Sequence, residues 1–317
     1  MRIPLRARFW ALACGLAALT TACSTVAEPL PSLDPLAALA ADSAATMEDL
    51  RFLSADALEG RATGSEGAAA AAAYIAAAFE AAGLDPLDGG FRHEFSWIPR
   101  GEPQERSGVN VLGSIPGTDR GGRYIVLSAH YDHVGIRNGA IYNGADDNAS
   151  GTVALLAIAR ALRGHPLRHS ILVSAFDGEE VGLQGATAFV NDPPVSLDAI
   201  EVDLNMDMVA RTDGVLWAGG AYHTPALRPV LEGVAARSPV TLRLGHDRPG
   251  APEGQDWSQS SDHGAFLREG IPFVYLGVED HVDYHRPTDD FENVDPGEYM
   301  AALRTALMTL LALDEAL

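Results

Sequence analysis

Histidines and acids that could bind a metal ion follow four apolar runs of the sequence. The first run, residues 124–129, leads directly into His130 and Asp132, and the second, residues 170–176, is followed by Glu179 and Glu180. The loop after the first run and the ends of two later runs add Asp146, Asp147, Asp207, Tyr284 and His285. Acids gathered on one rim would repel one another and raise each other's pKa, and a bound divalent cation would remove that conflict.

Any such metal ion would be held by nitrogen and oxygen atoms. The two cysteines, Cys14 and Cys23, both lie near the N-terminus, so the folded part of the chain offers no thiolate. Imidazoles together with carboxylates suit Zn²⁺, with Co²⁺ or Mn²⁺ as substitutes. Two Zn²⁺ ions that share a bridging carboxylate would orient and ionise a water molecule, which predicts a hydrolase.

Strand and helix patterns alternate along the chain, which predicts an α/β fold. Ser65 is the expected N-cap of a helix at 68–82 and Gly83 its C-terminal stop, whereas 97–122 is a polar stretch with glycine and proline. This alternation is typical of a three-layer αβα sandwich with a mostly parallel sheet, in which ligands bind beyond the carboxyl ends of the strands. The expected strands are 124–129, 170–176, 202–208 and 273–277, and the further helices are 152–163, 183–190, 225–237 and 296–313.

Five segments together resemble the motifs of a known family. The segments around His130–Asp132, Asp146–Asp147, Glu179–Glu180, Asp207 and His285 are similar, in the same order, to the five motifs of the M28 family of zinc aminopeptidases. The resemblance covers the chain from about Met47 to the C-terminus. It implies a zinc exopeptidase-like fold with two Zn²⁺ ions per chain.

The resemblance also implies the metal ligands. His130 and Asp207 would complete one metal site. Glu180 and His285 would complete the other, and Asp146 would bridge the two ions.

Three further residues take catalytic roles from the same resemblance. Asp132 would hold the second ring nitrogen of His130 and so fix its orientation. Glu179 would be the general base that takes a proton from the attacking water, and Tyr284 would help to polarise the scissile carbonyl. A cis peptide bond is implied between Asp146 and Asp147.

Other residues near these motifs receive more modest interpretations. Asp262 and His263 resemble a family segment that borders the substrate cleft, which makes them candidates for substrate binding. His133 follows the first ligand pair and could line the mouth of the site, but a structural hydrogen bond is the favoured interpretation for it. His281 has no motif partner and is expected at the surface or in packing.

The leading functional hypothesis is an aminopeptidase that removes N-terminal residues from peptides with a free N-terminus. Two alternatives stay open, a glutaminyl cyclase-like acyltransferase, which shares the fold and resembles a single-zinc version, and a catalytically inactive, receptor-like binding domain of the same fold. The formal net charge of −21 argues against a nucleic-acid partner, because neutralising phosphates needs clustered cations.

The N-terminus has the pattern of an export signal. Residues 1–8 carry three arginines, and residues 9–22 form a short apolar run, which is typical of a signal peptide over residues 1–22. The run ends in Leu-Thr-Thr-Ala-Cys, which resembles the bacterial lipobox, so Cys23 would become the lipidated first residue of the mature protein.

This signal predicts both the layout of the chain and its location. Residues 23–46 would be the lipidated N-terminus and a tether, and residues 47–317 the metallopeptidase catalytic domain. Ser24 after the cysteine suggests an exported, outer-membrane lipoprotein that faces the periplasm and contacts the membrane only through its lipid. Ordinary secretion, to the periplasm or beyond, is the alternative.

Overall fold

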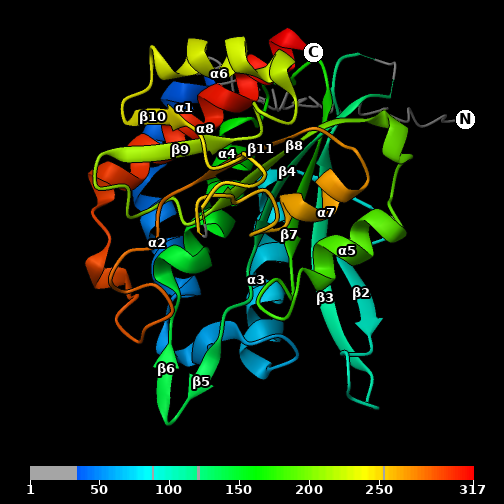
Figure 1. Ribbon diagram of the computed structural model, residues 1–317, viewed down its shortest axis with the longest axis vertical. Coiled ribbons are helices and arrows are strands. Elements are labelled where there is room, and N and C mark those ends of the chain that lie inside the picture. Colours follow the sequence, from blue (N-terminus) through cyan, green and yellow to red (C-terminus); the bar gives the residue numbers. More distant parts are fainter. Residues whose placement is uncertain (1–33, 88, 120–121, 253) are drawn as a thin grey trace, which may run out of the picture. The chain divides into compact units, whose positions relative to one another are not determined.

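A nine-stranded sheet lies at the centre of the computed structural model, which describes residues 34–87, 89–119, 122–252 and 254–317 (Figure 1). Four neighbouring strands in the middle of the sheet, in the order β7-β4-β8-β11, run parallel. Their carboxyl ends therefore meet at one edge, where α/β sheets bind ligands. In that order, the strands span Ser170–Phe176, Tyr124–His130, Ile200–Asp207 and Phe273–Gly277.

Other strands extend this parallel centre on both sides. β3 pairs antiparallel with β7 and also with β1 and β2, while β9 pairs antiparallel with β11 and parallel with β10. These strands are β1 (Asp85–Pro86), β2 (Arg92–Trp97), β3 (Arg106–Ile115), β9 (Val215–Gly219) and β10 (Thr241–Leu244). A separate hairpin consists of β5 (Gly135–Arg137) and β6 (Ala140–Tyr142).

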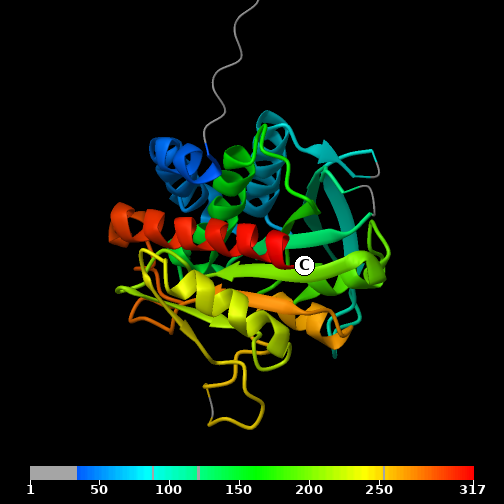
Figure 2. The same cartoon turned by 90° about the horizontal axis from the view of Figure 1, so that it is seen from above.

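Helices cover both faces of the sheet and bury two apolar cores (Figure 2). On β4, Ile125 and Leu127 face the larger core and Val126 faces the smaller one, because successive strand residues point to opposite faces. This arrangement confirms the predicted αβα sandwich. The larger core contains residues of α1 (Pro35–Ala41), α2 (Ser43–Leu53), α3 (Glu66–Ala82), α4 (Gly151–Ala161), α6 (Arg228–Ala235) and α8 (Pro296–Ala316), and the smaller core residues of α5 (Gln184–Asn191) and α7 (His263–Arg268).

Local signals set the ends of α3 as the sequence predicted. The Ser65 side chain accepts a hydrogen bond from the Ala68 N–H, which caps the first turn. Gly83 ends the helix in the left-handed region with a φ of 84°, a conformation that favours glycine. Between these caps, Ile75 and Phe79 are fully buried and fix the helix against the sheet.

The sequence prediction placed its first strand after the polar stretch 97–122, and the structure adds a strand within that stretch. It contains the ten-residue strand β3, which pairs with β7 from Val111 to Ile115. Glycine and serine interrupt the apolar alternation of this strand and hide its pattern in the sequence. The packing at Gly113 is close, since a Cβ atom there would lie 3.0 Å from the Leu84 side chain.

Residues 35–46 were predicted to belong to a tether, and this is also wrong. They form α1 and the start of α2, and Leu39 is only 1% exposed within the larger core. The Asp34 side chain accepts a hydrogen bond from the Leu36 N–H, and Pro35 suits the first helical turn. The alanines that indicated a linker are good helix formers.

Among the residues that the structure describes, no helix has the length and apolar character needed to cross a membrane. The predicted signal peptide, Cys23 and the beginning of the predicted tether lie outside the described residues.

The packing of α1 predicts the effect of shortening Leu39. Leu39→Ala should lower the free energy of unfolding by about 2–5 kcal/mol, because it leaves a cavity in the larger core. Ile98→Ala, the same kind of truncation at a side chain that is 67% exposed, should change it by less than about 0.5 kcal/mol. Urea unfolding measures both, and equal stability of the two variants would contradict the packing of α1.

Candidate metal centre

Four parallel strands lie side by side in the sheet (Figure 1), and most of the predicted ligands gather at their carboxyl ends. His130 is the last residue of β4 and Asp207 the last residue of β8. Glu179 and Glu180 lie in the turn after β7, and His285 lies in the loop after β11. Acids and imidazoles that are far apart in the sequence thus converge at the sheet edge, as predicted.

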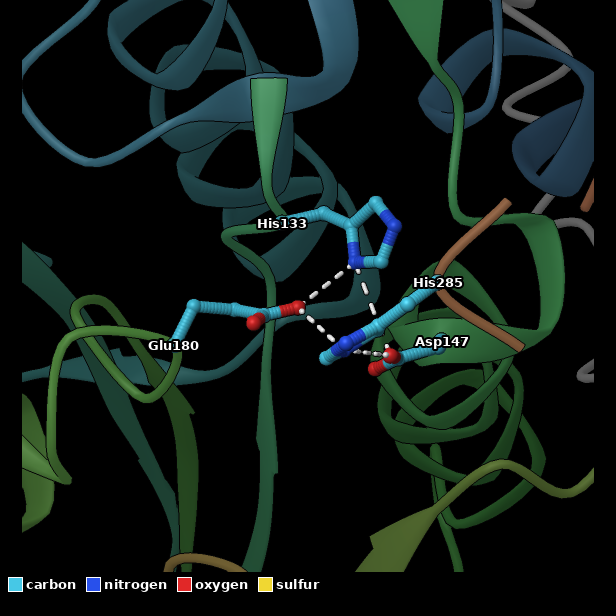
Figure 3. Close-up of side chains that lie close together, drawn as sticks. All are labelled: His133, Asp147, Glu180 and His285. Carbon is cyan, nitrogen blue, oxygen red and sulfur yellow. Dashed lines mark ion pairs between the residues drawn. The ribbon is translucent and has the colours of Figure 1, made fainter. Parts of the chain in front are cut away.

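One group of potential ligands consists of His133, Asp147, Glu180 and His285 (Figure 3). The His285 Nε2 atom lies 3.1 Å from Asp147 Oδ2 and 3.3 Å from Glu180 Oε1. The His133 Nδ1 atom lies 2.8 Å from Glu180 Oε1 and 3.6 Å from Asp147 Oδ2. Two imidazoles and two carboxylates therefore surround a single small space.

A second group, His130, Glu179 and Asp207, lies beside the first. The His130 Nε2 atom is 3.4 Å from Asp207 Oδ1 and 4.0 Å from Glu179 Oε2. It is also 3.6 Å from Asp147 Oδ1, the oxygen that does not face His285. Asp147 therefore presents one oxygen to each group, which is the geometry of a bridging carboxylate.

The donor atoms fit divalent metal ions of the size of Zn²⁺. Tetrahedral coordination with bonds of about 2.05 Å places neighbouring ligand atoms about 3.3 Å apart, which matches most of the separations above. Among the described residues, His130 Nε2, His133 Nδ1, Glu180 Oε1 and Asp207 Oδ1 are buried atoms without a hydrogen-bond partner. Two divalent cations would satisfy these atoms and balance the four carboxylates of the two groups.

Burial and neighbouring charges shift the pKa values of several groups in this centre. Burial raises the pKa of Glu179 well above its ordinary value, and the nearby Asp207 and Asp262 raise it further. The adjacent carboxylates of Asp147 and Glu180 raise the pKa of His285 to about 10. Both shifts have the sign expected of an anionic cluster that needs positive charge.

Asp132 positions the ligands of both groups. The His130 Nδ1 atom lies 3.1 Å from the Asp132 carbonyl oxygen and 3.6 Å from its carboxylate. That carboxylate accepts hydrogen bonds from the peptide N–H groups of Glu179 and Glu180, at 3.1 and 3.3 Å, and from the Thr63 hydroxyl. Asp132 therefore acts mainly on the turn that carries the two glutamates and holds the imidazole through its backbone.

The backbone around Asp147 is fixed in the same manner. The Asp289 carboxylate accepts hydrogen bonds from the N–H groups of Asp146 and Asp147, at 3.0 to 3.2 Å. The Asn148 side chain accepts from the Gly151 and Met208 N–H groups, which ties this loop to the end of β8.

A buried arginine connects two of the loops that carry ligands. Arg61 is 1% exposed and donates hydrogen bonds of 2.5–3.0 Å to the carbonyl oxygens of Leu53, Tyr131, Asn143 and Gly144. Burial lowers its pKa to about 10, so the guanidinium stays charged at neutral pH.

Comparison with known proteins gives a family to this arrangement. The family model of peptidase family M28 matches residues 110–310, most of the chain and all of the ligands described above. The chain belongs to peptidase family M28.

Two M28 relatives differ in the activity that their names give. The chain is 34% identical over 199 residues to a probable glutamate carboxypeptidase, VP8, of Zea mays, and 31% identical over 179 residues to aminopeptidase YwaD of Bacillus subtilis. These matches cover 57% and 54% of this chain but 26% and 36% of the two relatives. The chain thus matches about a quarter to a third of the length of these relatives.

Solved structures confirm the M28 fold. BSAP, a zinc aminopeptidase from Bacillus subtilis, superposes with a TM-score of 0.67 at 17% identity over 84% of this chain and 94% of its own. A glutaminyl cyclase from Porphyromonas gingivalis superposes with a TM-score of 0.68 at 20% identity over 87% and 98%. The predicted zinc exopeptidase-like fold is therefore confirmed, and the fold alone does not separate the two activities.

The structure corrects the predicted bridging residue. Asp146 lies outside both ligand groups, since its carboxylate accepts hydrogen bonds from the Ala210 N–H at 2.7 Å and the Ser150 hydroxyl and lies 3.1 Å from His281 Nε2. Asp147 occupies the shared position instead. The cis peptide bond is likewise between Asp147 and Asn148, not between Asp146 and Asp147. Adjacent aspartates look alike in a sequence, and only the backbone decides which one faces the sheet edge.

The two predicted substrate-binding residues are also placed differently. Asp262 and His263 are fully buried and do not line the cavity at the metal centre. The His263 ring lies between Phe273 and Tyr275, and its Nε2 atom lies 2.8 Å from the Trp257 carbonyl oxygen. His263 therefore supports two residues of the cavity wall, Trp257 and Tyr275, from behind.

From the sequence, we did not predict the position of His133 among the potential ligands or the contact of His281 with Asp146. His133 belongs to the first ligand group, and the spacing His130-x-Asp132-His133 directly after a strand is the signal that could have indicated this. His281, expected at the surface or in packing, pairs with Asp146. No motif marks that contact in the sequence.

A cavity of about 700 Å³ opens onto both ligand groups. Tyr284 lines it, with its ring stacked on His285 at a centroid distance of 4.0 Å. Apolar side chains and exposed acids share the wall, so the cavity can hold a substrate with both apolar and charged parts. The apolar members are Leu183, Met208, Trp257, Tyr275 and Val278, and the exposed acids are Asp256, Glu279 and Asp280.

Gly144 offers a test of the loop that carries Asp147. In Gly144→Ala the new Cβ atom would lie 2.1 Å from the Asp147 carbonyl oxygen and 2.5 Å from the His133 ring. We expect zinc affinity to fall about 10-fold or more, because two ligands must shift. Competition with a chromophoric chelator measures the affinity.

Gly139→Ala is the matched control. It also places alanine at a positive φ, 80°, but its Cβ would meet nothing within 4 Å. Its zinc affinity should stay at the wild-type value, and equal losses in both variants would contradict the proposed displacement of Asp147 and His133.

Proposed function

We propose that this chain is a dinuclear zinc aminopeptidase that removes N-terminal residues from peptides. The observation that carries the proposal is Asp147, whose two carboxylate oxygens face two adjacent sets of unsatisfied ligands. Cobalt or manganese could replace zinc with the same nitrogen and oxygen donors. The names of the aminopeptidase relatives support the same class of reaction.

The side chains divide the chemistry among them. When bound, two Zn²⁺ ions would lower the pKa of a water molecule and polarise the scissile carbonyl. The Glu179 carboxylate, beside His130 and Asp207, would take the proton from that water and pass it to the leaving amine. The hydroxyl of Tyr284, on the cavity wall, would donate a hydrogen bond to the developing oxyanion.

Acids at the cavity favour a substrate with a free α-amine. Asp256, Glu279 and Asp280 are exposed carboxylates that line the same cavity as Glu179. A protonated N-terminus would be attracted to this wall, whereas the carboxylate of a peptide C-terminus would be repelled. The charge of the cavity therefore favours an aminopeptidase over a carboxypeptidase.

Glu179→Gln tests the mechanism. Loss of the base should lower kcat for an unblocked aminoacyl-p-nitroanilide by about 10²- to 10⁴-fold. Zinc content should stay near wild type, because the Glu179 oxygen lies farther from His130 Nε2 than the nearest oxygens of Asp147 and Asp207 do. Steady-state kinetics with metal analysis measures both, and full activity of the variant would overturn the mechanism.

Controls separate the competing functions. Glu232→Gln changes an exposed glutamate on α6 and should leave the kinetics unchanged. N-acetylated substrates should not be cleaved, and zinc should restore activity after chelation. Cyclisation of N-terminal glutamine with one tightly bound zinc would instead indicate a glutaminyl cyclase, and zinc-independent ligand binding without turnover a receptor-like domain.

The N-terminal sequence adds a location to the proposal. Export as an outer-membrane lipoprotein would place the enzyme in the periplasm, where peptides are its substrates and the lipid is its only membrane contact. Cys23→Ser should move the protein from the membrane fraction to the soluble fraction of the producing cells, whereas Cys14→Ser should leave it membrane-bound. Immunoblotting of fractions measures this, and membrane retention of Cys23→Ser would rule out the lipid anchor.

A further inference from the structure

His133 is placed like a metal ligand and not like a supporting residue. Its side chain is fully buried, and its Nδ1 atom points with the Glu180 and Asp147 oxygens into the space that the four side chains of Figure 3 enclose. Its other ring nitrogen, Nε2, is buried and has no hydrogen-bond partner among the described residues.

A hydrogen bond to Glu180 does not account for this position. Although His133 Nδ1 and Glu180 Oε1 lie 2.8 Å apart, both atoms remain without a properly aligned hydrogen-bond partner among the described residues. Two ligand atoms that lie this close without hydrogen-bond alignment are expected where both bind the same metal ion. The separations of 2.8 and 3.6 Å on either side of His133 Nδ1 bracket the tetrahedral value of about 3.3 Å.

The backbone keeps the ring in this place. The His133 N–H donates to the Arg61 carbonyl oxygen at 3.3 Å, and Arg61 in turn holds the carbonyl oxygen of Gly144. Only a residue without a side chain fits at position 144, because a Cβ atom there would lie 2.5 Å from the His133 ring. The chain therefore holds His133 at the ligand group from two sides.

We infer that His133 is a fourth protein ligand of one zinc ion and that the two metal positions are consequently unequal. Four protein ligands, His133, Asp147, Glu180 and His285, would close a tetrahedral site. The other position has His130, Asp207 and the second oxygen of Asp147, which leaves one place open for water or substrate. Glu179, at 4.0 Å from His130 Nε2, lies too far to be a ligand in the same tetrahedron and stands beside the open place, where it could take a proton from a bound water.

This inference rests on the proposed dinuclear function and assigns different tasks to its two ions. The closed position would hold its ion more tightly and serve as a fixed charge. The open position would carry the reacting water. Removal of His133 should therefore change how tightly the first ion binds more than it changes the second.

Proton NMR of the cobalt-substituted protein identifies the histidine ligands without a measurement of enzymatic activity. High-spin Co²⁺ moves the N–H proton of a coordinated imidazole far outside the usual proton NMR range, so each bound histidine adds one exchangeable, shifted signal. We expect three signals from the wild-type protein, from His130, His133 and His285, and two from His133→Gln. His223→Gln, which removes a half-buried histidine that contacts Ser258, should keep three.

Zinc titration with buffered free Zn²⁺ gives a second readout. In the wild-type protein we expect two separate affinities, and His133→Gln and His133→Ala should weaken the tighter one about 10- to 100-fold. Glutamine can still donate a hydrogen bond to Glu180, so its loss of affinity would report on the imidazole. Circular dichroism and thermal unfolding in the presence of a chelator check that both variants fold.

The outcomes separate this inference from the proposed function. Two shifted signals in the wild-type protein, or an unchanged tighter affinity in both folded variants, would overturn the role of His133. One bound zinc with His133 among its ligands would support that role and contradict the dinuclear function.

Discussion

The main physical constraint on this structure is the repulsion among four carboxylates that the fold brings to one edge of the sheet. Asp147, Glu179, Glu180 and Asp207 lie within a few ångströms of one another and of three imidazoles. A bound cation, or a proton taken up by one of the acids, relieves this repulsion. The parallel strand ends supply the convergence, and the need for cations turns that convergence into a metal centre.

Hydrogen bonds to the backbone resist the repulsion between these acids. Asp132 and Asp289 each accept from two consecutive peptide N–H groups, and each thereby fixes a turn that carries ligands. Neither residue needs to contact a substrate for the site to depend on it. Burial and the neighbouring Asp146 raise the pKa of Asp289 to about 6, and the hydrogen bonds from the Asp146 and Asp147 N–H groups oppose that shift.

Much of this centre could be predicted from the sequence, and there are physical reasons why the rest could not. The strand ends at His130 and Asp207 were recognisable because a buried parallel strand reads as an apolar run. The choice between Asp146 and Asp147 was not, because it depends on which carboxylate the backbone turns toward the sheet edge. Likewise, β3 was hidden because its glycines serve close packing and break the strand pattern.

The hydrogen bonds of Arg61 affect the order in which this protein would fold and bind its metal ions. Its guanidinium donates to three carbonyl oxygens in the loops at Tyr131 and at Asn143–Gly144 and to that of Leu53 at the end of α2, and none of these hydrogen bonds involves a metal. The metal-binding loops are thus held in place before a metal ion binds, unlike small zinc domains that unfold when their metal is removed. The protein could therefore fold first and bind its metal ions afterwards, with no refolding step in between. Lysine could not substitute, because a single ammonium lacks the planar fork of donors that spans both loops.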